Sequence, residues 1–196
     1  MRANSARGSE LVAFYEKIKA CEDCPLARTR KSFVFGCGNP EASIMFVGEA
    51  PGEQEDKQGL PFVGPAGHLL DRLLEGVGIR RDDVFIANVL KCRPPGNRKP
   101  ADDEIAACDP HLAGQVKIVA PKFLVALGTF AAQSILRSTR PIGQIRGRWY
   151  RIGESDFLAT YHPSAGLRAG DFKRVIEADL KLLKEKLDKT RANPGN

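Results

Sequence analysis

Residues 43–52 read SIMFVGEAPG, a short apolar run that ends in a turn of glycine, proline and glutamate. A run of this length that stops at a glycine is typical of a strand buried on both faces. Three similar runs follow, and we expect strands at Ser43–Val47, Val84–Val89, Phe123–Leu127 and Phe157–Tyr161. Each run leads into a loop rich in glycine, proline or polar residues, at the end where α/β sheets bind their ligands.

Segments with helical spacing of apolar residues alternate with these runs. We expect helices at Glu10–Ala20, Gly67–Val77, Asp102–Ile118, from Thr129 to Leu136 and at Asp171–Leu187, with Ser9 and Thr129 as N-caps. This alternation predicts an α/β fold, in which a parallel sheet is covered by helices on both faces. We expect a single domain over residues 9–187, with a flexible leader at 1–8 and a flexible tail at 188–196.

Composition narrows the class of protein. The 196 residues are 42% hydrophobic and 28% charged, which is typical of a soluble globular domain. An apolar run of about 18 residues is absent, so we expect no membrane span. The polar start of the chain favours a cytoplasmic protein over a secreted one. The net charge of +6 favours a polyanionic partner such as nucleic acid, although solubility alone explains such a charge equally well.

The chain contains five cysteines, an odd number that argues against a disulfide framework. Cys21 and Cys24 form a C-x-x-C pair, and Cys92 and Cys108 flank a basic loop rich in proline. Four thiolates can hold a zinc ion or a [4Fe–4S] cluster, and the spacing alone does not choose between them. A redox-active C-x-x-C normally opens a helix after a strand, whereas here a helix precedes the pair. We interpret Cys37 as an ordinary cysteine.

Two loops after the first strand are candidates for a ligand pocket. The glycines and proline of Gly48–Gly52 let the backbone approach a small planar ligand closely, although a simple acidic turn is the alternative. No Gly-Lys-Ser/Thr follows, so the loop is not a Walker phosphate loop. Phe62 lies between proline and glycine in the next loop, where it is either part of the core or a surface on which a base stacks.

Polar residues follow two other strands. Asn88 ends the second strand, where it is either a turn former or a carboxamide that pairs with the edge of a nucleobase. The loop Arg93–Pro100 is basic and stiffened by prolines, which suits contact with phosphates. His162 precedes a proline at the end of the fourth strand, where it can donate a hydrogen bond to developing negative charge.

Together these motifs resemble the uracil-DNA glycosylase superfamily, and family 4 in particular, from Cys21 to about Leu183. The resemblance rests on Gly48–Gly52 with the acidic pair at 55 and 56, on His162-Pro-Ser164, and on four cysteines in the order and spacing of the family's cluster ligands. It implies a three-layer α/β/α sandwich with a central four-stranded parallel sheet. It also implies a monomer that excises uracil from single- or double-stranded DNA.

The resemblance further implies a role for each matching residue. The [4Fe–4S] ligands would be Cys21, Cys24, Cys92 and Cys108, while Cys37 matches none. The uracil pocket would consist of Glu49, Ala50, Pro51, Phe62, Asn88 and His162, and of these Glu49 and His162 would be catalytic. DNA contacts would come from Arg93, Arg98, Lys99, Ser164 and Arg168.

Three departures from relatives qualify these roles. Ala50 stands where family 1 enzymes carry an aspartate, so Glu49, with Glu55 and Asp56 as weaker candidates, would have to orient water. No histidine lies in Pro95–Pro100, which excludes the covalent chemistry of one relative. Gly166 replaces an apolar residue in the segment that would wedge into DNA. Two other classes of protein fit the residues less completely: a zinc-stabilised nucleic-acid-binding module without catalysis, and an electron-transfer protein.

Overall fold

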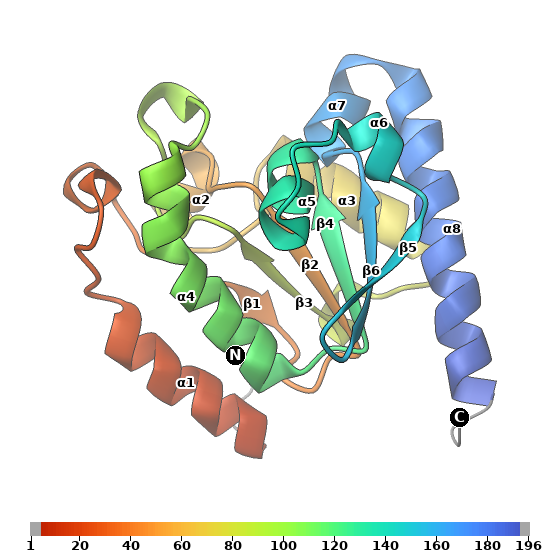
Figure 1. Cartoon of the computed structure of the whole chain (residues 1–196), viewed down its shortest axis with the longest axis horizontal. Helices are drawn as coiled ribbons and strands as arrows, with labels where there is room; N and C mark the ends of the chain where they lie inside the picture. The colour runs from red at the N-terminus through yellow and green to blue at the C-terminus, as the bar shows by residue number, and fades with distance from the viewer. Residues whose placement is uncertain (1–4, 193–196) are drawn as a thin grey trace.

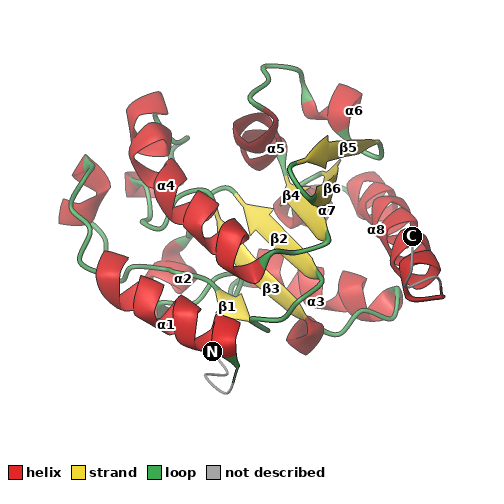
Figure 2. Ribbon diagram, turned by 60° about the horizontal axis from the view of Figure 1, so that its bottom comes forward, coloured by secondary structure: helices red, strands yellow, loops and turns green. Residues whose placement is uncertain are grey.

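The computed structural model describes residues 5–192, which form a six-stranded sheet with helices on both faces (Figure 1, Figure 2). The strand order is β1-β3-β2-β4-β6-β5. The strands are β1 (Cys37–Gly38), β2 (Ile44–Gly48), β3 (Val84–Asn88), β4 (Phe123–Leu127), β5 (Trp149–Ile152) and β6 (Ser155–Thr160). The four central strands are parallel to one another, as the sequence predicts.

The prediction of four strands omits the two edge strands, which are both antiparallel to their neighbours. β1 has only two residues, too few to leave a pattern in the sequence. β5 forms a hairpin with β6 through Gly153, whose positive φ of 53° suits a tight turn. Its side chains are half-buried or exposed, so β5 lacks the continuous apolar run that marks the central strands.

The helices form the two outer layers. Their bounds are α1 (Ala6–Ile18), α2 (Glu53–Gln58), α3 (Pro65–Gly76), α4 (Asp102–Val119), α5 (Thr129–Leu136), α6 (Ile142–Ile145), α7 (Pro163–Arg168) and α8 (Gly170–Ala192). Helices α1, α4 and α5 pack on one face of the sheet, and α3 and α8 pack on the other. The predicted three-layer α/β/α arrangement is therefore confirmed.

Alternate side chains of each strand supply the two halves of the core. On β2, Met45 and Val47 pack toward α1, α4 and α5, whereas Ile44 and Phe46 pack toward α3 and α8. Successive side chains of a strand point to opposite faces, so a strand covered on both faces must be apolar throughout. This requirement is the reason that the buried strands read as unbroken apolar runs.

The first helix begins earlier than predicted. Ser5 is the N-cap of α1, because its Oγ accepts a hydrogen bond of 3.1 Å from the backbone N–H of Gly8. The prediction of Ser9 as N-cap is wrong, since that residue lies inside the helix. Of the predicted leader, residue 5 is the N-cap, residues 6–8 are helical, and residues 1–4 lie outside the described part of the chain.

The last helix extends to Ala192, so residues 188–192 of the predicted tail are helical and residues 193–196 are not described. Lys184 donates to Asp188 at 2.6 Å, which is the i,i+4 pairing that stabilises an exposed helix.

The cap of α5 also differs from the prediction. Gly128 is the N-cap, with a φ of 96° that favours glycine, and Thr129 is the first helical residue.

The carboxyl ends of the central strands meet at one edge of the sheet. The parallel register pairs Gly48 with Asn88 and Leu127 with Thr160. The segments that follow these strands therefore gather side by side, which is the usual place for a ligand in an open α/β sheet. Among residues 5–192, no helix combines the length and the apolar character needed to cross a bilayer.

Candidate active site

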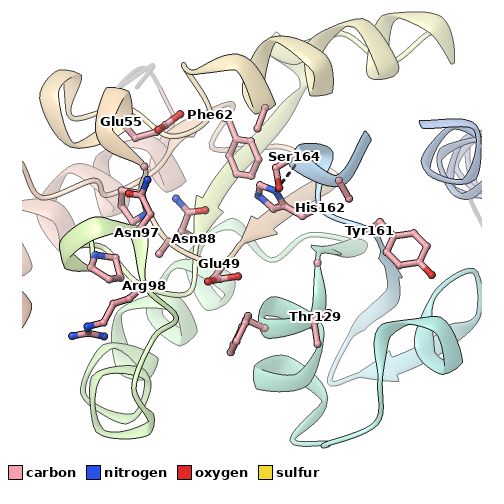
Figure 3. A pocket seen from close by; sticks show the side chains of 18 of the residues that line it. Glu49, Glu55, Phe62, Asn88, Asn97, Arg98, Thr129, Tyr161, His162 and Ser164 are labelled. Carbon is pink, nitrogen blue, oxygen red and sulfur yellow. Dashed lines mark hydrogen bonds between the residues drawn. The ribbon is translucent and has the colours of Figure 1, made fainter. Parts of the chain in front are cut away.

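A cavity of about 520 Å³ opens at this edge of the sheet (Figure 3). Nine of the predicted site residues line it: Glu49, Ala50, Pro51, Phe62, Asn88, Arg98, His162, Ser164 and Arg168. They come from the ends of β2, β3 and β6 and from the loops that follow these strands. The tertiary fold thus brings together residues that lie more than a hundred positions apart in the sequence.

The ring of Phe62 forms one wall of the cavity, and several contacts hold it there. Its φ of 53° is a left-handed conformation that few residues other than glycine adopt. A Cβ on Gly67 would lie 1.9 Å from the carbonyl oxygen of Phe62, so only glycine lets α3 begin this close to the loop. The carboxylate of Glu55 accepts hydrogen bonds from the backbone N–H groups of Val63 at 2.9 Å and Gly64 at 2.8 Å.

Gly48 lies beneath the two side chains that face the cavity from β3 and from the Phe62 loop. A Cβ on Gly48 would lie 2.4 Å from Oδ1 of Asn88 and 2.6 Å from Cζ of Phe62. Real Cβ atoms do not approach other atoms this closely, so any other residue at position 48 would displace one of the two. The glycine that ends the buried strand is therefore required by the shape of the cavity.

Asn88 presents an unpaired carboxamide to the cavity. The side chain is only 2% exposed, and within residues 5–192 its amide has no hydrogen-bond partner. The backbone around it is well tied, because the N–H groups of Val89 and Leu90 donate to the carbonyl oxygens of Gly48 at 2.9 Å and Glu49 at 3.0 Å. A carboxamide that reaches the cavity without a protein partner is ready to pair with a ligand that offers a matching donor and acceptor.

His162 faces Phe62, with ring centroids 5.6 Å apart and an angle of 35° between the rings. Its Nδ1 lies 2.8 Å from Oγ of Ser164 and accepts a hydrogen bond of 3.2 Å from the Ser164 backbone N–H, as the N-cap of α7. Since Nδ1 is an acceptor, the neutral ring carries its proton on Nε2. Burial lowers the pKa of His162 to about 4, so the ring is a neutral donor at neutral pH.

Glu49 directs its carboxylate into the cavity from the end of β2 (Figure 3). Burial raises its pKa above the usual value, and the nearby positive charge of Lys99 opposes the rise. Desolvation disfavours a carboxylate, so a Glu49 anion here is more reactive toward a proton or a nearby cation than one in water. The side chain is thus placed to orient water or to stabilise positive charge.

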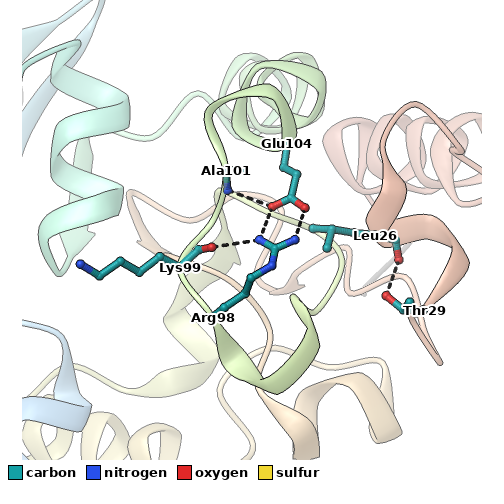
Figure 4. A network of polar contacts seen from close by, with 6 residues as sticks. All are labelled: Leu26, Thr29, Arg98, Lys99, Ala101 and Glu104. Atoms are coloured by element: carbon teal, nitrogen blue, oxygen red, sulfur yellow. Dashed lines mark hydrogen bonds and ion pairs between the residues drawn. The ribbon is translucent and has the colours of Figure 1, made fainter.

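The basic loop makes contacts that sequence reasoning did not anticipate. Both terminal nitrogens of Arg98 donate to the buried carboxylate of Glu104, at 2.9 and 2.6 Å (Figure 4). Glu104 also accepts from the backbone N–H of Ala101 at 2.9 Å, so the loop is fastened to the first turn of α4. Arg98 therefore has a structural partner in addition to its place on the cavity wall.

The other predicted DNA contacts are spread around the mouth of the cavity. Arg93 donates through Nε to the side chain of Asn97 at 2.8 Å, and Lys99 lies 5.9 Å from the ring centre of Phe130. Neither Arg93 nor Lys99 is among the residues that line the cavity. Ser164 lines it, but its hydroxyl contacts His162 rather than pointing freely toward solvent.

Sequence reasoning missed four polar or aromatic residues of the cavity: Asn97, Thr129, Phe130 and Tyr161. Asn97 has a φ of 54°, and its position after Pro-Pro-Gly suggests only a turn. Tyr161 directs its ring away from the interior of the cavity (Figure 3), where Phe172 packs edge-on at 4.7 Å. The Pro-Gly-Asn turn is the one signal in the sequence that could have drawn attention to Asn97.

A second, smaller cavity is lined by all four cysteines that the sequence singles out. Arg30 donates to Sγ of Cys92 at 3.3 Å, and the backbone N–H of Lys91 donates to Sγ of Cys108 at 3.3 Å. Cys37 lies elsewhere, on the edge strand β1. The structure therefore brings together the four candidate ligands and separates the fifth cysteine from them.

The thiols of this second cavity need a positive charge to ionise. Burial raises the pKa of Cys92, although Arg30 opposes the rise, and it raises the pKa of Cys108 to about 11. A metal that binds thiolates supplies the missing charge and releases the protons. Cys21 also lies beside Asp23 and His111, and one ligand atom from each of these three residues falls within 4.8 Å of the other two.

Comparison with known proteins agrees with this geometry. The family model of the uracil DNA glycosylase superfamily matches residues 35–183. The type-4 uracil-DNA glycosylase of Sulfurisphaera tokodaii is 44% identical over 87% of this chain and 81% of its own length. That of Thermotoga maritima is 43% identical over 89% of this chain and 93% of its own length. A type-5 uracil-DNA glycosylase of Thermus thermophilus is more distant, at 29% identity over 78% of this chain and 86% of its own length.

Proposed function

Because this chain belongs to the uracil DNA glycosylase superfamily, we propose that it is a DNA-repair enzyme that removes uracil and leaves an abasic site. The observation that carries this function is the cavity in which an aromatic ring, a carboxamide, a carboxylate and a neutral imidazole meet. Its volume of about 520 Å³ admits a pyrimidine nucleotide that has been turned out of the DNA stack.

Asn88 is the residue that reads the base. Uracil offers a donor at N3 and an acceptor at O4, and a carboxamide offers the complementary pair. Cytosine presents the opposite pattern and would leave buried polar groups unpaired, which disfavours it strongly. Phe62 stacks on the base, and its fixed conformation keeps the stacking surface in place before DNA arrives.

His162 and Glu49 act on the glycosidic bond. As the C1′–N1 bond breaks, the electron pair goes to the base and positive charge develops on the sugar, as in other oxocarbenium-like reactions. The Nε2–H of His162 donates to uracil O2 and stabilises the leaving anion. Glu49 orients the water whose oxygen bonds to C1′, with Ala50 beside it in place of an aspartate. This water loses one proton as the bond forms, and the uracil anion takes up one proton as it leaves.

The four cysteines hold a [4Fe–4S] cluster. The four cysteines line one cavity, where N–H groups of Arg30 and Lys91 donate to the sulfurs of Cys92 and Cys108 and so favour their thiolate forms. When bound, the cluster joins the N-terminal C-x-x-C segment to the loop after β3 and serves the architecture of the site.

DNA, single- or double-stranded, is the partner, and the enzyme works as a cytoplasmic monomer. Arg93, Arg98, Lys99 and Arg168 surround the mouth of the cavity, where phosphates attract positive charge. Ser164 supports the same face from the first turn of α7. The net charge of +6 favours the approach of this polyanion.

The direct test is incubation of the purified protein with an oligonucleotide that contains one deoxyuridine, followed by alkali. We expect strand cleavage at the uracil position only, and none in the same oligonucleotide with thymine or cytosine at that position. Asn88→Ala and His162→Ala should each lower the single-turnover rate by about 100-fold or more, since each removes a group that contacts the reacting base. Intact deoxyuridine after incubation with metal-loaded protein would refute the proposed function.

A further inference from the structure

Lys91 is a completely buried lysine that contacts one residue of each cavity, Asn88 and Cys108, and the roles proposed above assign it no function. Its ammonium group donates to the carbonyl oxygen of Asn88 at 2.7 Å and to Oε1 of Gln115 at 2.6 Å. Within residues 5–192, it forms no ion pair with a carboxylate. Burial of a cation costs desolvation free energy, so the position of the Lys91 ammonium group indicates a specific role.

Gln115 extends this contact to another part of the chain. It is completely buried on α4, and its Nε2 donates to the carbonyl oxygen of Phe35 at 2.7 Å. Both ends of its amide are therefore engaged, which fixes Oε1 toward Lys91. The result is a polar chain from the carbonyl of Phe35, through Gln115 and Lys91, to the carbonyl of Asn88.

This chain replaces hydrogen bonds that the sheet itself cannot provide. The antiparallel register pairs Cys37 of β1 with Ile86 of β3, and its continuation would set Phe35 opposite Asn88. The ladder ends before that point, so within the described chain the carbonyl oxygens of Phe35 and Asn88 accept no hydrogen bond from the opposite strand. Lys91 and Gln115 supply the donors, at the point where β3 ends in the cavity.

The parallel ladder with β2 holds the end of β3 on one side, whereas on the other side the ladder with β1 has already ended. The carboxamide of Asn88 has no hydrogen-bond partner among the described residues, so its direction depends on the position of its main chain and on the space that Gly48 leaves open. The main chain of Lys91 is itself fixed, because its N–H donates to Sγ of Cys108 and its carbonyl accepts from Val34 at 2.8 Å. Lys91 thus connects the base-reading residue to the cysteine site.

We infer that Lys91 and Gln115 are positioning residues for uracil recognition, which hold Asn88 so that its carboxamide meets the edge of the base. This inference rests on the proposed function. Neither residue touches the base, and both act through the main-chain carbonyl of Asn88. Their loss should therefore affect how the base is read and should leave the contacts with DNA phosphates unchanged.

The test is a double-mutant cycle between Asn88→Ala and Gln115→Met, with Lys91→Met as a second, more severe variant. Gln115→Met removes the hydrogen bonds to Lys91 and to Phe35, and the loss of the one to Lys91 should lower the single-turnover rate at saturating DNA about tenfold. It should weaken inhibition by free uracil by a similar factor and leave the half-saturating DNA concentration unchanged. In the Asn88→Ala background, Gln115→Met should cause no further loss, because the group that it positions is gone.

Ser155→Ala is the matched control. Its Oγ donates to the carbonyl oxygen of Pro121 at 2.6 Å, so the variant loses one buried side-chain hydrogen bond at the opposite end of the sheet. We expect a lower Tm with an unchanged rate and unchanged inhibition by uracil. Absorbance near 400 nm, measured for every variant, reports whether the cysteine site is still loaded.

The outcomes separate the inference from the proposed function. Wild-type rates and wild-type inhibition by uracil in a folded Gln115→Met protein would overturn the inference, as would losses that add fully to that of Asn88→Ala. Should Lys91→Met fail to fold, Gln115→Met decides the question alone. A wild-type protein that leaves uracil in DNA would overturn the proposed function, and the inference with it.

Discussion

The imidazole of His162 combines two features that matter for its chemistry. The backbone N–H of Ser164 donates to Nδ1 of the ring, so the ring proton lies on Nε2. Burial lowers the pKa of the ring from 6.5 to about 4. Glu55 raises this pKa and Arg168 lowers it, and both effects are smaller than that of burial. The ring is therefore a neutral donor through Nε2 near neutral pH, as the proposed contact with the base requires.

A pH dependence of stability follows from this lowered pKa. Between pH 6.5 and about pH 4, His162 is protonated in the unfolded chain and neutral in the folded chain. The free energy of unfolding should therefore be unaffected by this group above pH 6.5 and should fall as the pH drops from 6.5 toward 4. Urea unfolding of the wild type and of His162→Gln between pH 4 and 8 measures this, and identical pH profiles would contradict it.

Gly48 allows a second test at the level of one residue. In Gly48→Ala the new methyl group would overlap Oδ1 of Asn88 and the ring of Phe62, so one of them must move. We expect the single-turnover rate to fall by about 10- to 100-fold, the kinetic equivalent of the strain of overpacking. Gly76→Ala is the matched control, because a Cβ at that position meets nothing within 4 Å. An unchanged rate in Gly48→Ala would show that the cavity tolerates the methyl group.

At the scale of elements, Glu55 joins the short helix α2 to the start of α3. Its carboxylate accepts from the N–H groups of Val63 and Gly64, which lie just before α3 begins, and so fixes the loop that carries Phe62. The sequence makes this residue a weaker candidate for orienting water. The contacts of its carboxylate favour a role in holding the stacking surface instead.

Two substitutions distinguish these roles of Glu55. Glu55→Gln keeps an oxygen that can accept from the loop, so we expect a rate within about threefold of the wild type, whereas Glu55→Ala should lose about tenfold or more. The same ranking should hold for inhibition by free uracil. If Glu55 orients water, the glutamine and alanine variants should be equally impaired, and binding of free uracil should not change in either.

For the whole molecule, the cysteine site gathers residues from segments that are distant in the sequence. Cys21 and Cys24 follow α1, Cys92 follows β3, and Cys108 lies on α4. Metal binding at such a site contributes directly to folding, because the unfolded chain offers no preformed set of ligands. The loop that joins β3 to α4 also carries part of the cavity wall, so loss of the site should loosen the cavity as well.

Cys108→Ser tests this role against Cys37→Ser. We expect Cys108→Ser to lose absorbance near 400 nm and to lower Tm by on the order of 10 °C, as the loss of several kcal/mol implies for a chain of this size. Cys37→Ser should keep both the absorbance and the Tm, since Cys37 lies on β1, away from the other four. Equal losses in the two variants would contradict the assignment of the ligands.

The sequence carries clear signals for features that depend on local chemistry. Local sequence predicts the central strands, the helix at Asp102, the four cysteines and the motifs around Glu49 and His162. It can do so because apolar runs, helical periodicity and ligand spacing are properties of neighbouring residues. The two edge strands and the true ends of the first and last helices are not. They depend on which segments lie alongside, or on a cap several residues before the apolar pattern starts.

By itself, then, the sequence determined an α/β sheet with a ligand site at its carboxyl edge and a separate set of four thiols. Only the tertiary structure decided that Arg98 pairs with Glu104, that Glu55 holds the Phe62 loop, and that Lys91 and Gln115 support Asn88. The physical reason is that the donors and acceptors of buried polar groups are found in space. Gln115 and Phe35 are 80 residues apart in the chain, and no local pattern can predict that they meet.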